Sequence, residues 1–436
     1  MSNPHHLSDD TLVHGLGESG RRVNDVDYVR RDEALAMLGI KKESLYTYVS
    51  RGLIKTLAEP GRRTSLYRKS DLEKLRTRAG AKGGGAPVDQ SLRYGEPVVQ
   101  TSICDISTVG PRYRGQLATT LAREGRSLEY VADLLWGGLP PARDRPWPVL
   151  EDESAEQFGK MAALSPCTDG FSPIRVLAIA ALQLSALEAA GVARSNGDAR
   201  VSGSRLVHTF AGISGYFGPD QAYESAMADE FVARRVLRGF GLSGRHDAEQ
   251  LFAAINVALV LSADNELSAP TFCARISSST GVDIYACVTS ALMAQAGPMQ
   301  AGGMMDLEQY LAEVLYANRP VAYTGVPCFG HPLYDRDPRA EHLLEVVRNL
   351  STNATTRERL LEFVDAVRNR TGTYPNLFAA LVILAHVIGL PAGAALYLHC
   401  LGRTAGWVAH AAEQRLSGVM LRPRARYMGT RSPGSF

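Results

Sequence analysis

Apolar residues recur at helical spacing along most of the chain beyond residue 95, with polar residues between them. This spacing predicts amphipathic helices, and no segment of useful length alternates in the manner of a strand. Residues 375–388 are apolar on most sides, which is typical of a buried helix. We therefore expect an all-α fold for this part of the chain. The predicted helices cover residues 115–123, 128–135, 173–190, 221–240, 248–263, 283–296, 306–318, 340–349, 356–370, 375–388 and 392–412.

A different pattern, between residues 26 and 79, predicts a small separate module. Residues 32–38 and 42–50 have the spacing of two short helices. The Pro-Gly pair at 60–61 marks a turn between two short strand-like runs. A helix, a tight turn, a second helix and a hairpin together make a winged helix-turn-helix, similar to the DNA-binding domain of the MerR and excisionase group.

The charge of this module supports a role in DNA binding. Residues 21–82 carry 16 Lys and Arg against 8 Asp and Glu, whereas the whole chain has a formal charge of +2. A local surplus of basic residues is the usual electrostatic footprint of a nucleic-acid binder. The alternative is a small helical cap that is basic without binding DNA. The residues expected to face DNA, on the second helix and at the hairpin tip, are Ser44, Tyr46, Thr47, Arg51, Arg62 and Arg63.

Length and composition limit the other classes. At 436 residues the chain exceeds the usual single core, so we expect two or three domains. The longest apolar runs are far shorter than the ~20 residues of a membrane span, and the start has no secretory pattern, so we expect a cytoplasmic protein. The six cysteines are scattered, which predicts buried thiols and no metal site. Residues 1–20 predict a disordered tail and residues 80–94 a glycine-rich flexible linker.

The residues with recognisable chemistry are concentrated toward the C-terminal end. His331 stands shortly before Arg339, and Arg403 and Arg422 follow in later segments. An arginine holds a carboxylate through two parallel hydrogen bonds and keeps its charge. One imidazole with three arginines therefore predicts a site for a small di- or tricarboxylate. The alternative for each residue taken alone is a structural histidine or an ordinary surface ion pair.

Several motifs occur in the order that one enzyme family uses, and with them residues 95–430 resemble the citrate synthase family. The resemblance implies a large helical domain, residues 95–270 with 376–436, and a small helical domain, residues 271–375, which close over ligands in a cleft. It also implies a two-fold homodimer in which one carboxylate-binding arginine reaches into the partner's site. The motifs are Val-Gly-Pro-Arg-Tyr-Arg-Gly at 109–115, Val-Ala-Asp-Leu-Leu-Trp-Gly-Gly-Leu-Pro at 131–140, Ala-Asp-Asn-Glu-Leu at 263–267, Gly-Pro-Met-Gln-Ala-Gly-Gly at 297–303, Gly-His at 330–331, Asp-Pro-Arg at 337–339, Tyr-Pro-Asn at 374–376 and Arg-Pro-Arg at 422–424.

Citrate synthases remove a proton from the methyl carbon of an acyl thioester and add that carbon to the keto carbon of oxaloacetate. The resemblance implies that His331 polarises the keto group and that Arg339, Arg403 and Arg422 bind carboxylates. It implies a coenzyme A thioester as a substrate or ligand and no tightly bound cofactor.

Three catalytic or binding positions depart from the family's pattern. The enol-stabilising histidine is replaced by Gln300, the oxoacid-binding histidine by Asn265, and the aspartate that acts as general base by Phe378. A benzene ring cannot accept a proton, and the loss of a general base typically costs about 10²–10⁴ in rate. Cys328 also replaces a glycine in the loop that approaches coenzyme A in the family.

We therefore expect a citrate-synthase-like protein with a degenerate catalytic site. It would bind citrate, oxaloacetate or a similar carboxylate and couple that binding to the DNA-binding module. One alternative is an active enzyme that forms or breaks a carbon–carbon bond beside a thioester through a non-standard site. Another is an interaction partner of an active paralogue.

Overall fold

The computed structural model describes residues 28–38, 45, 49, 54, 56–58, 65–69, 71–72, 99–148, 172–191, 197–316 and 322–423. Contacts within the chain divide it into two compact units. The first contains Met1–Gln100 with Pro423–Phe436, and the second contains Thr101–Arg422.

The described part of the first unit is a small sheet with one helix. Strands β1 (Tyr28–Val29), β3 (Ser65–Arg68) and β2 (Thr56–Ala58) pair antiparallel in that order, and α1 covers Arg31–Leu38. The buried residues of this unit form a core of their own, made of Val29, Ala34, Leu38, Leu45, Ile54, Tyr67 and Leu72.

The winged helix-turn-helix stays a prediction. Strands β2 and β3 pair on either side of the predicted turn, but most of the predicted second helix lies outside the described residues. The same is true of every predicted DNA contact, namely Ser44, Tyr46, Thr47, Arg51, Arg62 and Arg63.

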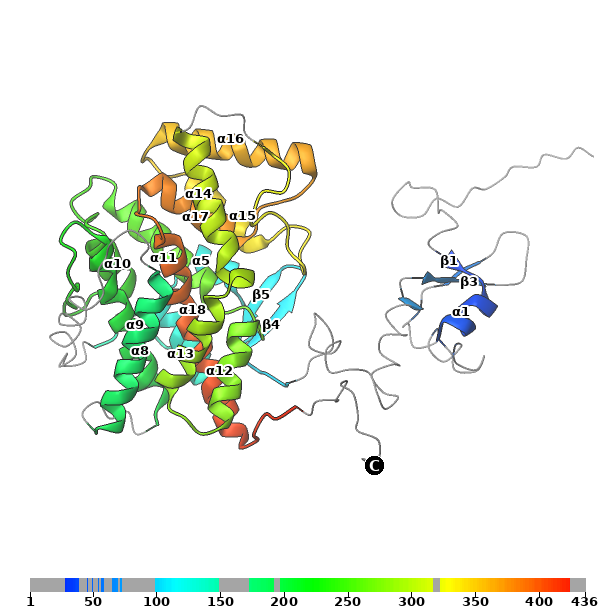
Figure 1. Cartoon of the computed structure of the whole chain (residues 1–436), viewed down its shortest axis with the longest axis horizontal. Helices are drawn as coiled ribbons and strands as arrows, with labels where there is room; N and C mark the ends of the chain where they lie inside the picture. The colour runs from blue at the N-terminus through cyan, green and yellow to red at the C-terminus, as the bar shows by residue number, and fades with distance from the viewer. Residues whose placement is uncertain are drawn as a thin grey trace, which may run out of the picture. The chain divides into compact units, whose positions relative to one another are not determined.

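The second unit is built mainly of helices, as the spacing of apolar residues predicts (Figure 1). Among the described residues, none of these helices is long and apolar enough to cross a membrane. The helices are α5 (Ala118–Arg123), α6 (Leu128–Gly137), α8 (Pro173–Ala189), α9 (Ala199–Ile213), η1 (Ser214–Phe217), α10 (Val232–Gly239), α11 (Ala248–Ser262), α12 (Ala269–Ser279), α13 (Ile284–Gln295), the π-helical turn η2 (Pro298–Gly302), α14 (Gly303–Tyr316), α15 (Pro338–Arg348), α16 (Ala354–Thr371), α17 (Leu377–Ile388) and α18 (Ala394–Ser417).

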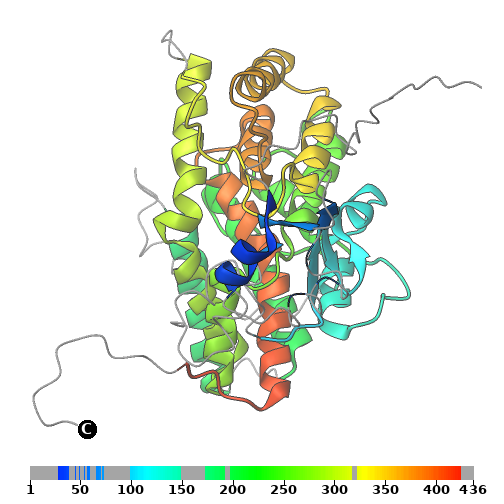
Figure 2. The ribbon, with the colours of Figure 1, turned by 90° about the vertical axis from the view of Figure 1, so that its right-hand side faces the viewer.

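Helix α18 is the axis of this unit. Figures 1 and 2 show it, in orange-red, running lengthwise through the unit with other helices around it. It packs against α6, α8, α9, α11, α12, α13, α14 and α17. The prediction that residues 375–388 form a buried helix is confirmed, because α17 buries all its residues except Phe378 and His386. A helix surrounded on all sides needs apolar residues on all sides, which explains the sequence of α17.

The prediction that this part of the chain has no strands was wrong. Strands β4 (Cys104–Ser107), β5 (Gly110–Tyr113) and β6 (Gln116–Leu117) form an antiparallel meander. Such short strands cannot show a clear alternation of apolar and polar residues. The predicted helix 115–123 accordingly begins only at Ala118, after β6.

The predicted helix 221–240 is also shorter than expected, since α10 begins only at Val232. Tertiary contacts hold the preceding segment as a loop. Arg235 Nε donates to the Glu224 carbonyl oxygen at 2.8 Å, and Arg238 Nη2 pairs with Glu230 at 2.8 Å. These bonds depend on the fold and leave no local signal in the sequence.

Candidate functional site

The loop that carries His331 is fastened to the start of α17. The Gly330 amide donates to the Tyr374 carbonyl at 2.7 Å, and the Asn376 amide donates to the Cys328 carbonyl at 3.0 Å. Asn376 also donates from its side chain to the Gly330 carbonyl at 3.1 Å. The side-chain oxygen of Asn376 caps α17 by accepting from two backbone amides of its first turn. The loop residues directly before His331 are therefore held against the segment that begins α17.

Cys328 adopts a backbone conformation that favours glycine, with φ at 62°. For a residue with a Cβ this left-handed conformation costs roughly 1–2 kcal/mol. The strain agrees with the resemblance, in which a glycine stands here. Burial, with a smaller effect of Asp306, raises the pKa of the Cys328 thiol to about 12. The thiol is therefore protonated and unreactive at neutral pH.

Arg339 lies at the start of α15 and is held by a buried aspartate. Its Nε and Nη2 donate to the two oxygens of Asp337 at 3.0 and 2.9 Å. Asp337 Oδ1 also accepts from the Arg339 amide, and Oδ2 accepts from the Leu377 amide at 3.0 Å. Burial alone would raise the pKa of Asp337, but the charge and hydrogen bonds of Arg339 hold it below its usual value. This carboxylate joins the first turns of α15 and α17.

Three predicted site residues meet at the Arg339 guanidinium. Nη1 donates to Asn265 Oδ1 at 3.0 Å, and Nη2 lies 3.5 Å from His331 Nε2. His331 Nδ1 accepts from the Leu333 amide at 3.1 Å. A neutral imidazole that accepts at Nδ1 carries its proton on Nε2. Burial, and the Arg339 charge, lower the pKa of His331, although Asp337 opposes the shift. The ring proton of neutral His331 therefore lies on Nε2, the nitrogen nearer Arg339.

Arg403 is the second buried arginine of the site. Its Nη2 donates to Thr271 Oγ1 at 2.8 Å and to Ser268 Oγ at 3.1 Å. Its Nη1 lies 3.1 Å from Asp264 Oδ1 as an ion pair. That contact lacks hydrogen-bond geometry, so both atoms are buried without a hydrogen-bond partner among the described residues. Burial would raise the pKa of Asp264, but Arg403 and His410 lower it.

Phe378 and His399 form the apolar side of the site. The two rings meet edge to face, with centroids 4.8 Å apart and planes at 79°. His399 is 6% exposed, and its Nδ1 is buried without a hydrogen-bond partner in the described part of the chain. Burial, followed by the charges of Arg403 and Arg339, lowers the pKa of His399 to about 3. The sequence interpretation missed this residue, although it precedes Arg403 by one turn of a predicted helix.

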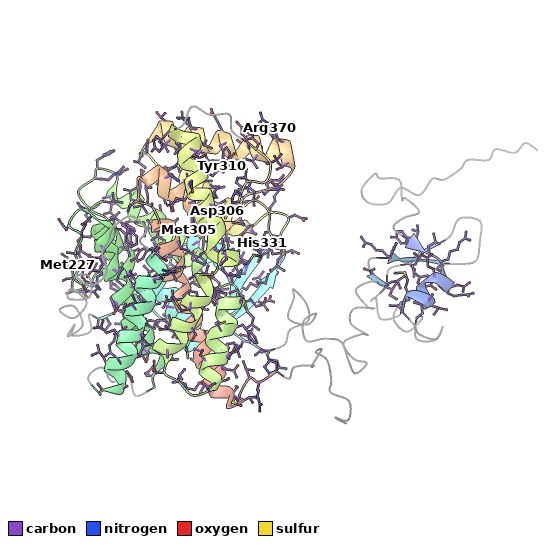
Figure 3. The ribbon with its side chains drawn as sticks, viewed as in Figure 1. Met227, Met305, Asp306, Tyr310, His331 and Arg370 are labelled. Atoms are coloured by element: carbon purple, nitrogen blue, oxygen red, sulfur yellow. The ribbon has the colours of Figure 1, made fainter. Side chains whose placement is uncertain are left out.

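The other candidate residues lie on separate segments of the second unit. Gln300 is half-buried in η2, between α13 and α14, and Arg422 is exposed just beyond the end of α18. Asp306 on α14, labelled in Figure 3, and Asp335 in the loop before α15 are both exposed. Neither carboxylate is therefore desolvated as proton abstraction would favour.

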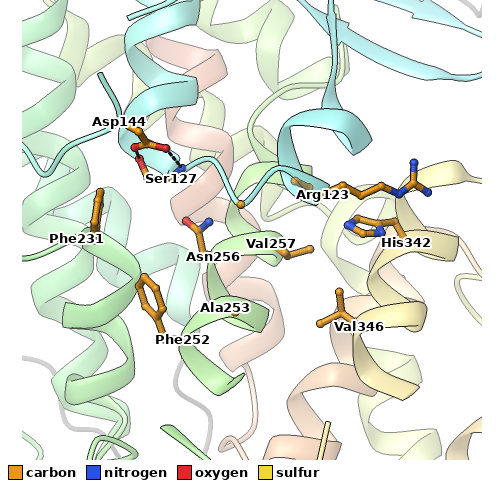
Figure 4. Close-up of a pocket in the computed structure, with 12 residues that line it drawn as sticks. Arg123, Ser127, Asp144, Phe231, Phe252, Ala253, Asn256, Val257, His342 and Val346 are labelled. Carbon is orange, nitrogen blue, oxygen red and sulfur yellow. Dashed lines mark hydrogen bonds between the residues drawn. The ribbon is translucent and has the colours of Figure 1, made fainter. Parts of the chain in front are cut away.

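Two cavities of about 410 and 630 Å³ lie elsewhere on the unit. They share Arg123 and His342, and the smaller one is also lined by Ser127 and Asp144, which hydrogen-bond to each other (Figure 4). No predicted site residue lines either of them.

Comparison with known proteins identifies the family of the chain. The family model "Citrate synthase, C-terminal domain" matches residues 93–424. Citrate synthase 2 of Bacillus subtilis is 31% identical over 202 residues, which cover 44% of this chain and 54% of that protein. Putative citrate synthase 2 of Mycobacterium tuberculosis is 29% identical over 321 residues, 68% of this chain and 80% of that protein. The alignment with the Bacillus protein thus spans about half of its length.

Solved structures share the fold. Citrate synthase of Pyrobaculum aerophilum matches 78% of this chain and 92% of its own with a TM-score of 0.62 and 25% identity. The ternary complex of citrate synthase from Thermoplasma acidophilum with carboxymethyl coenzyme A and oxaloacetate matches 78% of this chain and 96% of its own, with a TM-score of 0.60 and 22% identity. The chain belongs to the citrate synthase family, and the resemblance read from its motifs is confirmed.

Proposed function

We propose that this protein binds a small di- or tricarboxylate of the oxaloacetate or citrate type without the family's proton abstraction, and that binding is coupled to an N-terminal DNA-binding module. The observation that carries the proposal is the pair of buried arginines, Arg339 and Arg403. They are only 4% and 2% exposed, and Arg403 Nη1 has no hydrogen-bond partner among the described residues. A buried donor left unpaired costs about 1–3 kcal/mol, which a ligand carboxylate would offset.

The group around these arginines suits an oxoacid. Arg339 and Arg403 supply two guanidinium groups, which a ligand would share with their present partners Asp337 and Asp264. His331 would supply a neutral donor for the oxygen between two carboxylates. A relative of the same fold, from Thermoplasma acidophilum, is described in complex with oxaloacetate, which supports oxaloacetate as the first ligand to test. Because both arginines are almost fully buried, we expect the ligand to enter when α15 and α18 separate and to hold them together once bound.

The described residues near the expected thioester position offer little support for proton abstraction. Phe378 occupies the position of the family's base and packs against another ring, that of His399. Asp306 and Asp335 are exposed and do not provide the desolvated carboxylate that proton abstraction favours. Gln300 can donate a hydrogen bond to an enolate oxygen but cannot shuttle a proton. These features support carboxylate binding over condensation.

A chain of polar contacts leads from the Arg403 ion pair toward the start of the unit. Asp264 Oδ2 is 3.3 Å from His410 Nε2, and His410 Nδ1 is 3.2 Å from Arg275 Nη1. Arg275 Nη1 also donates to Glu413 Oε2 at 2.6 Å. Asp264, His410 and Arg275 are buried, so each bond is expensive to break without a replacement.

Glu413 ends this chain by holding the first residues of the second unit. Thr101 Oγ1 donates to it, as do the amide and hydroxyl of Ser102, each at 2.7 Å. Burial alone would raise the pKa of Glu413, but these bonds and Arg275 lower it to about 2. Residues 101–102 directly follow the segment that joins the N-terminal unit. A ligand that draws Arg403 away from Asp264 would thus act on this junction, which supports coupling.

Homodimerisation belongs to the same proposal. Arg422 is exposed in one chain, which suits an arginine that completes the site of a second copy. Closure of two such sites would change the spacing of two DNA-binding modules, and half-site spacing decides whether a dimer fits its operator.

The binding claim can be tested by calorimetry with oxaloacetate and citrate. Arg403→Lys keeps the charge but loses the planar fork, so we expect affinity to fall by about tenfold to a hundredfold, as for a charge-assisted hydrogen bond of about 1.5–3 kcal/mol. Arg234→Lys is the matched control, since Arg234 pairs with Glu249 at the surface. No binding of any carboxylate by the wild-type protein would remove the proposal. Equal binding by both variants would show that Arg403 is not a ligand residue.

A further inference from the structure

His399 is a polar residue of the site that no motif of the sequence explains. It lies on α18 one turn before Arg403, nearly buried, with Nδ1 unpaired among the described residues. Its ring packs edge to face with the ring of Phe378. In the resemblance to citrate synthases, Phe378 stands at the position of the general base. Buried polar nitrogens are almost always paired in folded proteins, so an unpaired one requires an explanation.

The surroundings keep this imidazole neutral while the site is empty. Helix α17 offers it only the apolar ring of Phe378, while α15 and α18 bring the charges of Arg339 and Arg403 close enough to act on it. Burial first, and then these two charges, lower the pKa of His399 to about 3. The other ionisable groups near the two arginines include Asp337, His331, Tyr334 and Tyr113 around Arg339, and Asp264, Glu266 and Cys104 around Arg403.

We propose that His399 is a ligand residue of the carboxylate site, which takes up one proton from solvent when a dicarboxylate binds between Arg339 and Arg403 and then donates a hydrogen bond to it. This inference rests on the proposed function. The ligand brings two negative charges to the arginines whose repulsion disfavours the imidazolium, and it brings an acceptor for the unpaired nitrogen. The reaction balances as protein, dianion and one proton forming the complex.

The sign of the pH dependence follows from this linkage. The ligand raises the pKa of His399 from about 3 in the empty site. Between that value and the higher value in the complex, affinity increases by up to about tenfold for each pH unit of acidification. Above the pKa of the complex, affinity no longer depends on this residue. A histidine charged in this way cannot accept a proton from an acyl methyl group, so it does not replace the missing base.

The number of protons taken up is measurable by calorimetry of the full chain with oxaloacetate at about pH 6, where histidines titrate. Two buffers of different ionisation enthalpy give the uptake directly. We expect uptake of a substantial fraction of one proton by the wild-type protein and its loss in His399→Phe, which keeps a ring against Phe378. The control is His386→Gln. His386 on α17 is a half-buried histidine whose pKa is also lowered by burial, but its ring contacts the Glu308 carbonyl and not Phe378.

The outcomes separate the two proposals. If the wild-type protein binds no carboxylate, the proposed function is wrong and this inference falls with it. If oxaloacetate binds but His399→Phe retains the uptake, the proton goes to another group, such as His331, and this inference alone is wrong. The wild-type protein provides a check that needs no variant, since an affinity that stays constant from about pH 5.5 to 8 contradicts a linked histidine.

Discussion

Asp337 is the residue whose change tests the architecture of the site most severely. It is 1% exposed and accepts hydrogen bonds from the Arg339 side chain, the Arg339 amide and the Leu377 amide. In Asp337→Asn, one oxygen remains to accept from Arg339. The other becomes an NH2 group that faces two donors, the Leu377 amide and Arg339 Nη2. The substitution changes almost no volume, so its effect measures charge and hydrogen bonding.

The expected loss of stability is large. Removing one partner of a buried ion pair leaves an uncompensated charge and typically costs about 3–5 kcal/mol. The Arg339 guanidinium is 4% exposed and cannot turn to solvent without moving the start of α15. An exposed pair behaves differently. Glu249→Gln removes the partner of Arg234 at the surface, where solvent screens the pair and the loss of stability is small.

Urea denaturation followed by tryptophan fluorescence measures both variants. The three tryptophans, Trp136, Trp147 and Trp407, all lie in the second unit, so the signal reports on the unit that contains Asp337. Arg339→Met combined with Asp337→Asn should recover part of the loss, because no buried charge is then left without a partner. A loss for Asp337→Asn as small as that for Glu249→Gln would refute the assignment of a buried, energetically coupled pair.

Three other changes test neighbouring parts of the account. Asn376→Ala removes the cap of α17 and the bond to Gly330, and should cost about 1–2 kcal/mol in the same urea assay; an unchanged midpoint would contradict the capping role. The pKa of Glu413 is about 2 in the folded protein, below the value of about 4.3 for an unfolded glutamate. The stabilisation that ionised Glu413 contributes is therefore complete above about pH 4.3 and is lost as pH falls toward 2. The urea midpoint should therefore fall less on acidification in Glu413→Gln than in the wild-type protein. Equal falls would contradict a stabilising role for the Glu413 carboxylate. Phe378→Asp restores a carboxylate at the position of the base, and should bring thiol release from acetyl-coenzyme A with oxaloacetate to about 10²-fold or more above the rate without protein. Release that stays at the rate without protein would count against the lost base as the cause of inactivity.

Much of the helical unit could be predicted from the sequence, because the spacing of apolar residues within a buried helix is a local signal. The continuous apolar run of α17 and the long pattern of α18 depend on their own residues. The meander of β4, β5 and β6 could not be predicted, since strands of two to four residues are too short to show a period. The loop before α10 was missed because the bonds of Arg235 and Arg238 that hold it are tertiary.

The site divides in the same way. Motif order was enough to nominate Asn265, His331 and Arg339, and the structure joins these three by direct contacts. The ion pair between Arg403 and Asp264 was not predicted, because it depends on how the loop after α11 packs against α18. His399 had one usable signal, its position four residues before Arg403 on a predicted helix. The burial of His399 could not be predicted, because it depends on the helices that pack around α18.

The central claim is that this site holds a dicarboxylate but does not deprotonate an acyl methyl group. The most direct measurement is the release of free coenzyme A when the purified full chain is mixed with acetyl-coenzyme A and enough oxaloacetate to saturate binding in calorimetry. The account predicts no release above the rate without protein. Sustained release over many turnovers, abolished by His331→Ala, would contradict it.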